Sequence, residues 1–179
     1  MTRHSGTVDH PNRRLLVALP DSYEQARERY ETLVPAYDGA AFAAASNWDE
    51  VLAIAKVQAP HGFLRYFGFD IAPSMAGSGS NGRATQYLMG NHTIAERMYR
   101  HDPTVMIHAP LRTLIWEGPD GAARFTVDQP SSDFGSYGKP EIAAVGVELD
   151  RKLAALLEHL GVEVPEALLT SDTAVTGAR

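Results

Sequence analysis

The chain has 179 residues, 44% hydrophobic and 21% charged, proportions typical of one globular domain that buries its own core. A formal charge of −6 at pH 7 disfavours a nucleic-acid partner, because nucleic acids bind surfaces where Lys and Arg cluster. The chain has no cysteine for disulfides or thiolate chemistry, no apolar run of membrane-spanning length and no secretory signal at its polar start, so we expect a cytoplasmic protein.

The first third of the chain predicts one strand and two helices. Residues 1–13 are polar and predict a flexible arm, whereas the apolar run of residues 14–19 predicts a strand that Pro20 ends. Apolar residues then recur at helical spacing from Tyr23 to Leu33, after a cap at Asp21 or Ser22. A second helix begins after Ser46-Asn47 and stops before Pro60.

The middle of the chain predicts two strands joined by a long loop. Residues 62–71 alternate, with Phe63, Arg65, Phe67 and Phe69 on one face, and residues 83–89 form the next strand. Between them, residues 73–82 contain the pattern GxGxxG. A dinucleotide site needs a helix after this pattern, and here a strand follows, so we predict a plain loop.

The last part predicts a short helix, a hairpin and a long helix. Thr93 and Glu96 match a capping box, and Asp102-Pro103 stops the helix that they begin. Residues 111–117 and 123–127 are strands around a Gly-Pro-Asp-Gly turn, and residues 131–140 are predicted as a loop. Leucines at helical spacing predict a final helix that ends near Gly161, and residues 165–179 are predicted as a tail.

This order of elements predicts a single α+β domain over residues 14–164. Alternation along the strands indicates an antiparallel sheet with one solvated face. Helices before and after the strands would cover the other face. The expected architecture therefore has two layers, with a curved antiparallel sheet packed on the long C-terminal helix.

The order and spacing of several short motifs resemble a known bacterial family, domain of unknown function 302. The motifs are TQYLMGN at residues 85–91, the helix from Thr93, the Asp102-Pro103 break and PLRTLIWE at residues 110–117, followed by the turn at residues 128–130. Two features depart from the family pattern. Residues 42–82 form a longer and more aromatic region, and His108 stands where members commonly carry an acidic residue.

The resemblance implies a fold similar to the helix-grip and TBP-like architecture, in which a curved sheet wraps a long C-terminal helix. It also implies a homodimer and a cavity between the sheet and that helix. Such a fold does not by itself indicate an activity.

Six residues are candidates for a site in that cavity. His108 lies between apolar residues before a strand and could act as a general acid or base, with Asp102, Tyr66 or Tyr87 as its partner. A hydrogen-bonded core histidine and a simple Asp-Pro turn are the simpler interpretations of these residues. Tyr66, Tyr87 and Trp116 could line the cavity, and Arg112 could bind an anion, although aromatic residues at strand spacing usually just pack.

Two functions follow from these candidates. The first is binding of a small, partly apolar molecule, and the alternative is an acid–base lyase or isomerase that uses the same cavity, with metal or haem assistance left open. A dimerisation module is a third interpretation. None of the seven histidines forms an i, i+4 pair, so the sequence predicts no metal ligands and leaves the cofactor unknown, although folding could bring His92 and His108 together.

Overall fold

The computed structural model describes residues 6–170. Its strands are β1 (Arg14–Ala18), β2 (Leu64–Asp70), β3 (Ala84–Gly90), β4 (Leu111–Glu117) and β5 (Ala123–Asp128). Its α-helices are α1 (Tyr23–Leu33), α2 (Gly39–Ala43), α3 (Trp48–Gln58), α4 (Ala72–Met75), α5 (His92–Tyr99), α6 (Pro130–Gly135), α7 (Pro140–His159) and α8 (Glu166–Leu169). Two short 3₁₀ helices, η1 (Ala76–Ser78) and η2 (Pro103–Ile107), complete the list.

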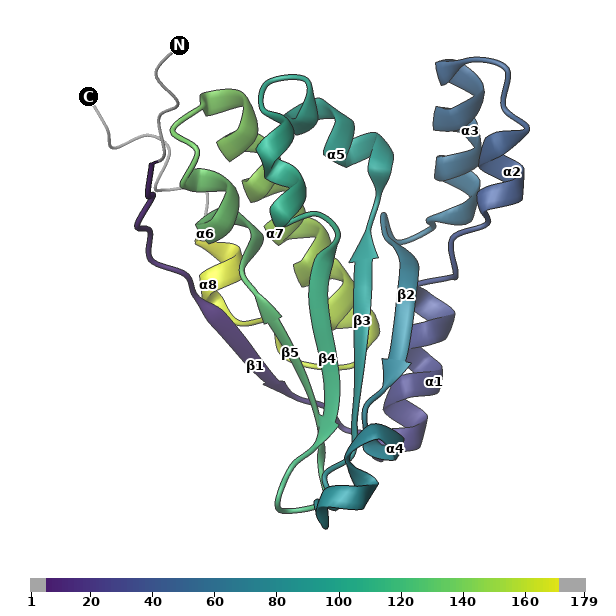
Figure 1. The fold of residues 1–179 in the computed structure, drawn as a ribbon, viewed down its shortest axis with the longest axis vertical. Coiled ribbons are helices and arrows are strands. Elements are labelled where there is room, and N and C mark those ends of the chain that lie inside the picture. The colour runs from purple at the N-terminus through teal and green to yellow at the C-terminus, as the bar shows by residue number, and fades with distance from the viewer. Residues whose placement is uncertain (1–5, 171–179) are drawn as a thin grey trace.

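The five strands form one antiparallel sheet in the order β1-β5-β4-β3-β2. The first strand pairs with the last one, so β1 closes one edge, and β2 forms the other edge. Helices α1 and α7 lie behind the sheet, while α5 and α6 sit at the end where β4 begins (Figure 1). The predicted fold class is confirmed, because a long C-terminal helix packs on one face of an antiparallel sheet.

Helix α1 is held on the sheet by its predicted apolar stripe. Tyr23, Ala26 and Tyr30 are buried, and each tyrosine hydroxyl finds a threonine on a neighbouring strand. The Tyr23 hydroxyl lies 2.8 Å from Thr85 Oγ1 in β3, and the Tyr30 hydroxyl lies 2.9 Å from Thr113 Oγ1 in β4. Because buried hydroxyls need partners, these two bonds set where α1 lies along the sheet.

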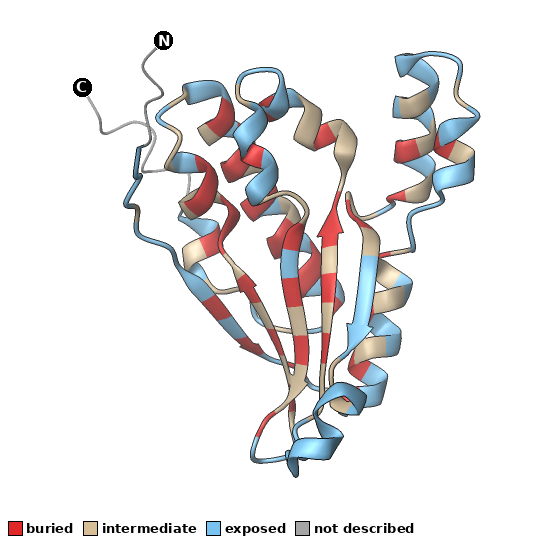
Figure 2. Cartoon of the chain, in the orientation of Figure 1, coloured by how far each residue is buried: buried red, intermediate tan, exposed pale blue. Residues whose placement is uncertain are grey.

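Helix α7 supplies the centre of the core. Leu153, Leu156 and Leu157 are fully buried, as are Ile115 and Phe125 on the facing strands, and Figure 2 shows the same face of α7 in red. The helix ends as the sequence predicts, since Gly161 adopts the left-handed conformation with φ of +79°. The layer between the sheet and α7 is therefore filled with side chains.

Several local predictions differ from the structure, and one concerns residues 73–82, which are predicted as a plain loop although α4 and η1 occupy residues 72–78. The cap of α5 is Asn91, whose side chain accepts the Thr93 amide at 3.0 Å, and the predicted cap Thr93 lies inside the helix. Residues 131–135, predicted as the first part of a loop, belong to α6 (Pro130–Gly135). Its first turn is capped from another helix, since Asp150 Oδ1 accepts the Ser131 amide at 2.9 Å. Helix α2 was not predicted at all.

Both ends of the described chain are anchored to the domain, although the sequence predicts a flexible arm over residues 1–13 and a tail over residues 165–179. The Asn12 side-chain amide donates to Asp133 Oδ1 at 2.8 Å, and the Arg13 guanidinium donates to Gln129 Oε1 at 3.0 Å. At the other end, Leu168 of α8 is buried in the core. Residues 1–5 of the predicted arm, with His4, and residues 171–179 of the predicted tail lie outside the described residues. Across residues 6–170, no helix combines the length and apolar character needed to cross a membrane.

Candidate functional site

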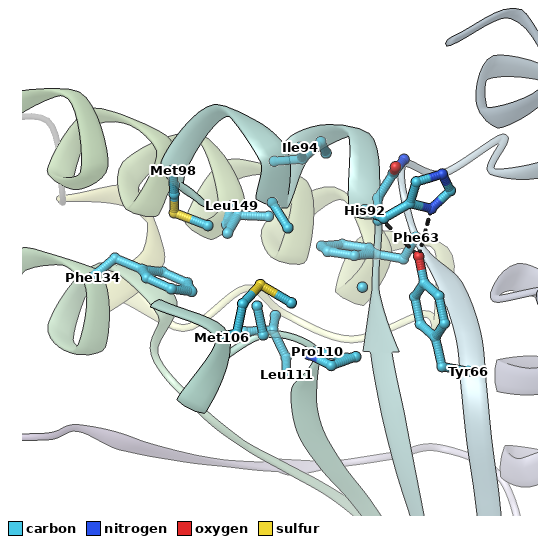
Figure 3. A pocket seen from close by; sticks show the side chains of 14 residues that line it. Phe63, Tyr66, His92, Ile94, Met98, Met106, Pro110, Leu111, Phe134 and Leu149 are labelled. Atoms are coloured by element: carbon cyan, nitrogen blue, oxygen red, sulfur yellow. Dashed lines mark hydrogen bonds between the residues drawn. The ribbon is translucent and has the colours of Figure 1, made fainter. Parts of the chain in front are cut away.

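A cavity of about 250 Å³ lies at the end of the sheet where β3 stops and β4 begins. Helix α5 forms one wall and the turn after η2 forms the opposite wall, with Phe63 behind them (Figure 3). Helix α7 contributes Leu149 alone. The lining residues are Phe63, Tyr66, Gly90, Asn91, His92, Ile94, Ala95, Met98, Met106, Ala109, Pro110, Leu111, Phe134 and Leu149. The cavity thus lies beneath α5 and not, as predicted, between the sheet and the C-terminal helix.

The cavity is apolar on most sides and polar at one end. Figure 3 shows methionine, leucine and phenylalanine side chains around the space, with Tyr66 and His92 together at one side. The Tyr66 hydroxyl lies 2.9 Å from His92 Nδ1 and accepts the His92 backbone N–H at 3.0 Å. The hydroxyl and a neutral imidazole carry one proton each, and their mutual bond uses only one of the two. The pair therefore keeps one N–H or O–H donor for another partner.

Burial keeps both groups uncharged near neutral pH. It raises the pKa of Tyr66 to about 12, an effect that the His92 backbone N–H partly opposes. Burial also lowers the pKa of His92 below its ordinary value. This end of the cavity therefore offers hydrogen bonds without a net charge.

Aromatic rings from the chain before β2 hold this pair in place. Tyr37 stacks on Tyr66 with ring centroids 4.8 Å apart, and Phe42 of α2 meets the His92 ring edge-on at 4.5 Å. No local pattern in the sequence identifies Tyr37, Phe42 or His92 as neighbours of Tyr66, because they come from three separate segments.

A β-bulge aims Tyr66 at the cavity. Arg65 is opposite Met89 and Phe67 is opposite Leu88, so Tyr66 is the extra residue between them. Since Met89 and Leu88 point to opposite faces of the sheet, the bulge also separates Arg65 from Phe67. The predicted common face for Arg65, Phe67 and Phe69 is wrong for this reason.

The three aromatic candidates lie in three different places. Tyr66 lines the cavity beneath α5. Tyr87 is buried beneath α1, where its hydroxyl donates to Glu31 Oε1 at 2.8 Å and its ring lies 4.7 Å from Tyr30. Trp116 is half-buried on the opposite face of the sheet, and its Nε1 donates to Thr126 Oγ1 at 3.0 Å. The fold therefore does not assemble these rings into one site.

His108 and Arg112 line a second, smaller hollow of about 180 Å³. The carboxylate beside His108 is Asp133 of α6, with Nδ1 and Oδ1 3.6 Å apart. Asp133 is 5% exposed, and burial raises its pKa, although His108 partly opposes the shift. His10, close to the start of the described chain, completes this group. His92 and His108 thus belong to different hollows.

Asp102, the predicted partner of His108, has other partners. It caps η2 by accepting the Thr104 amide at 3.0 Å, and Lys139 Nζ lies 2.8 Å from its other oxygen. These bonds, led by that from Lys139, lower the pKa of Asp102 to about 2. Asp102 is therefore placed as a helix cap.

The loop with the GxGxxG pattern lies far from both hollows. It follows β2, whose third residue Tyr66 lines the cavity, and it emerges at the opposite end of the sheet beside α4 (Figure 1). The strand β3 follows it, as the sequence indicated.

Comparisons with known proteins identify the family and no activity. A crystal structure described as an uncharacterized conserved protein DUF302 from Bacillus stearothermophilus superposes with a TM-score of 0.61 at 15% identity. The match covers 82% of this chain and 97% of that one, which shows a shared fold. No curated protein matches the chain. The family model "Domain of unknown function DUF302" matches residues 46–160, well over half of the chain, so the protein belongs to that family.

Proposed function

We propose that the cavity beneath α5 binds a small, largely apolar molecule that carries one polar group. The observation that supports this proposal most is the distribution of its lining. Apolar side chains surround the space, and the Tyr66–His92 pair supplies hydrogen bonding at one end. Sites of this kind use apolar walls for affinity and a few polar groups for orientation.

The size of the cavity limits the ligand. A buried apolar cavity of about 150 Å³ accommodates benzene, so a space of about 250 Å³ suits roughly ten non-hydrogen atoms. At a typical binding energy of roughly −0.5 kcal/mol per atom, such a ligand binds with a Kd of about 0.2 mM. Naphthalene and 2-naphthol are suitable probes because they share one apolar body and differ by a hydroxyl.

Filling the cavity tests the proposal. We expect Ala95→Trp to abolish binding of 2-naphthol to the full-length protein, because residue 95 faces the cavity from α5. Ala144→Trp, on the exposed side of α7, is the matched control and should bind as the unchanged protein does. Titration calorimetry measures both, and equal affinity in the two variants would rule the cavity out as the binding site.

The polar end has its own test. Removing the Tyr66 hydroxyl with Tyr66→Phe should weaken 2-naphthol binding about fivefold, the effect of one net hydrogen bond of about 1 kcal/mol. Naphthalene has no polar group and should bind both forms equally. If 2-naphthol is also unaffected, the Tyr66–His92 pair does not orient the ligand.

An acid–base reaction in this cavity is the less favoured alternative. Among the described lining residues, Tyr66 and His92 are the titratable ones, and His108 faces the other hollow. Tyr66, with a pKa of about 12, stays protonated near neutral pH and is a poor general base. The protonated Tyr66 hydroxyl is therefore better suited to hydrogen bonding with a ligand than to proton transfer.

We further propose that the protein is a homodimer in the cytoplasm. The outer face of the sheet supports the dimer, because the register places Leu16, Thr126, Leu114, Gln86 and Phe69 in one row across all five strands. This row has no charged residue, and Leu16 and Phe69 are 68% and 44% exposed. An uncharged, partly apolar row across a sheet face suits contact with a second copy of the chain. The cytoplasmic location rests on composition, and cell fractionation would test it.

A further inference from the structure

The smaller hollow brings together two histidines and one carboxylate from distant parts of the chain. His10 precedes β1, His108 follows η2 and Asp133 lies in α6. One ligand atom from each of the three lies within 4.8 Å of the other two. Imidazole and carboxylate are ligands that zinc and related divalent ions accept.

Two features of burial distinguish this group from an ordinary surface cluster. Asp133 is 5% exposed, so its carboxylate needs partners that compensate for lost water. The Nδ1 atom of His10 is also shielded from solvent, and within the described chain it has no hydrogen-bond partner. Buried polar atoms are nearly always satisfied, which makes this nitrogen a group in need of a ligand.

We propose that His10, His108 and Asp133 bind a divalent transition-metal ion, with zinc as the ion that fits best. Zinc bonds of about 2.0–2.2 Å in tetrahedral geometry place ligand atoms about 3.4 Å apart. His108 Nδ1 and Asp133 Oδ1 are already 3.6 Å apart. The His10 ligand atom lies within 4.8 Å of the other two, so it has to approach by at most about 1.4 Å, a movement that side-chain rotation supplies.

Neighbouring residues support the ligands and leave one position open. Asn12 Nδ2 donates to Asp133 Oδ1 at 2.8 Å, and Asn12 Oδ1 accepts from Ser132 Oγ at 2.9 Å. Such bonds orient a ligating carboxylate. Three protein ligands leave a fourth position, which faces a hollow that Arg112 also lines. Water or a small anion beside that guanidinium would complete the coordination.

The metal site is separate from the ligand cavity, so the two proposals are tested independently. Phe134 lies between them, since its ring lines the apolar cavity and sits 6.1 Å from the His108 ring. Naphthol binding does not need the metal, and zinc binding does not need the cavity. A failure of one test leaves the other result unaffected.

Calorimetric titration with zinc chloride tests the metal site. The sample is the full-length protein without a histidine tag, freed of metal with a chelator and then dialysed. We expect one zinc ion per chain. Since loss of a supporting residue costs about 10–100-fold in metal affinity, His10→Ala or His108→Ala should cost at least about 100-fold, and Asn12→Ala about tenfold. His10→Ala is the primary variant because its segment lies before β1, outside the core.

A second histidine pair provides the matched control. The rings of His61 and His159 lie 4.3 Å apart on another part of the surface. His159→Ala should leave zinc affinity unchanged. The proposal is overturned if the unchanged protein binds no zinc, or if His159→Ala loses the ion while His10→Ala keeps it. Cobalt absorption spectra give a second readout, because replacing His10 should change the ligand-field bands of the bound ion.

Discussion

At the scale of single residues, the environment of His92 makes stability depend on pH. Its ring is enclosed by Tyr37, Phe42 and Tyr66, and burial lowers its pKa below the ordinary value of about 6.5. The unfolded chain therefore takes up a proton at a higher pH than the folded protein does. Stability is then present above pH 6.5 and falls as the pH drops through the lowered pKa of the folded state.

Replacing His92 should remove this part of the pH dependence. We expect the loss of unfolding free energy between pH 7 and pH 5.5 to be smaller in His92→Gln than in the unchanged protein. Urea denaturation at the two pH values measures it, in the presence of a chelator so that metal binding plays no part. Equal losses in the two proteins would contradict the assigned environment of His92.

At the scale of elements, the close packing of α6 on α7 depends on a glycine. A Cβ atom added at Gly146 would lie 3.0 Å from Phe134 Cβ and 3.2 Å from Ser131 Cα, and the second contact is with backbone. The two helices meet there because position 146 has no side chain. Phe134 and Asp133 are carried on α6, so this contact also positions one wall of each hollow.

Gly146→Ala should therefore destabilise the protein by about 1–3 kcal/mol, the typical cost of overpacking, although alanine is the better helix former by about 1 kcal/mol. Gly135→Ala is the control, since nothing lies within 4 Å of a Cβ added at that position of α6. Thermal or urea denaturation compares the variants. A Gly146→Ala protein as stable as the control would show that α6 can shift without cost.

The regular elements could be predicted because their signals are local. The stripe of α1, the strands and the leucine spacing of α7 all follow from periods of 3.6 or 2 residues within one segment. Helix α6 was missed because the group that caps it, Asp150, lies in α7. The orientation of Tyr66 was missed because a bulge depends on the strand opposite.

The sites were harder to predict than the elements for the same reason. Tyr66 is a candidate because it is aromatic, but nothing near it in the chain indicates His92 or Phe42 as a neighbour. The apolar neighbours of His108 mark it as a candidate, and the sequence offers Asp102 as a nearby carboxylate partner. The partner in the fold is Asp133, which only the packing of α6 brings to it.

At the scale of the whole molecule, the outer face of the sheet should decide the oligomeric state. We expect Phe69→Arg to convert a dimer to a monomer, because it places a charge in the uncharged row of that face. Val57→Arg, at an 80% exposed position of α3, is the control and should leave the dimer intact. Light scattering with size-exclusion chromatography measures the mass. A monomeric unchanged protein, or dissociation by Val57→Arg alone, would refute this interface.

The pairing of β1 with β5 also has a consequence for biosynthesis. Residues 14–18 find their partners at residues 124–128, which leave the ribosome roughly 110 residues later, or about 5–20 s at normal rates of translation. During that interval the segment RLLVA has no strand to pair with. The nascent chain therefore exposes its unpaired backbone N–H and C=O groups and its apolar side chains, which favour aggregation. A chain truncated after Glu117 should accordingly show fast amide exchange at residues 15–18, and a holdase chaperone should bind it more strongly than the full-length protein.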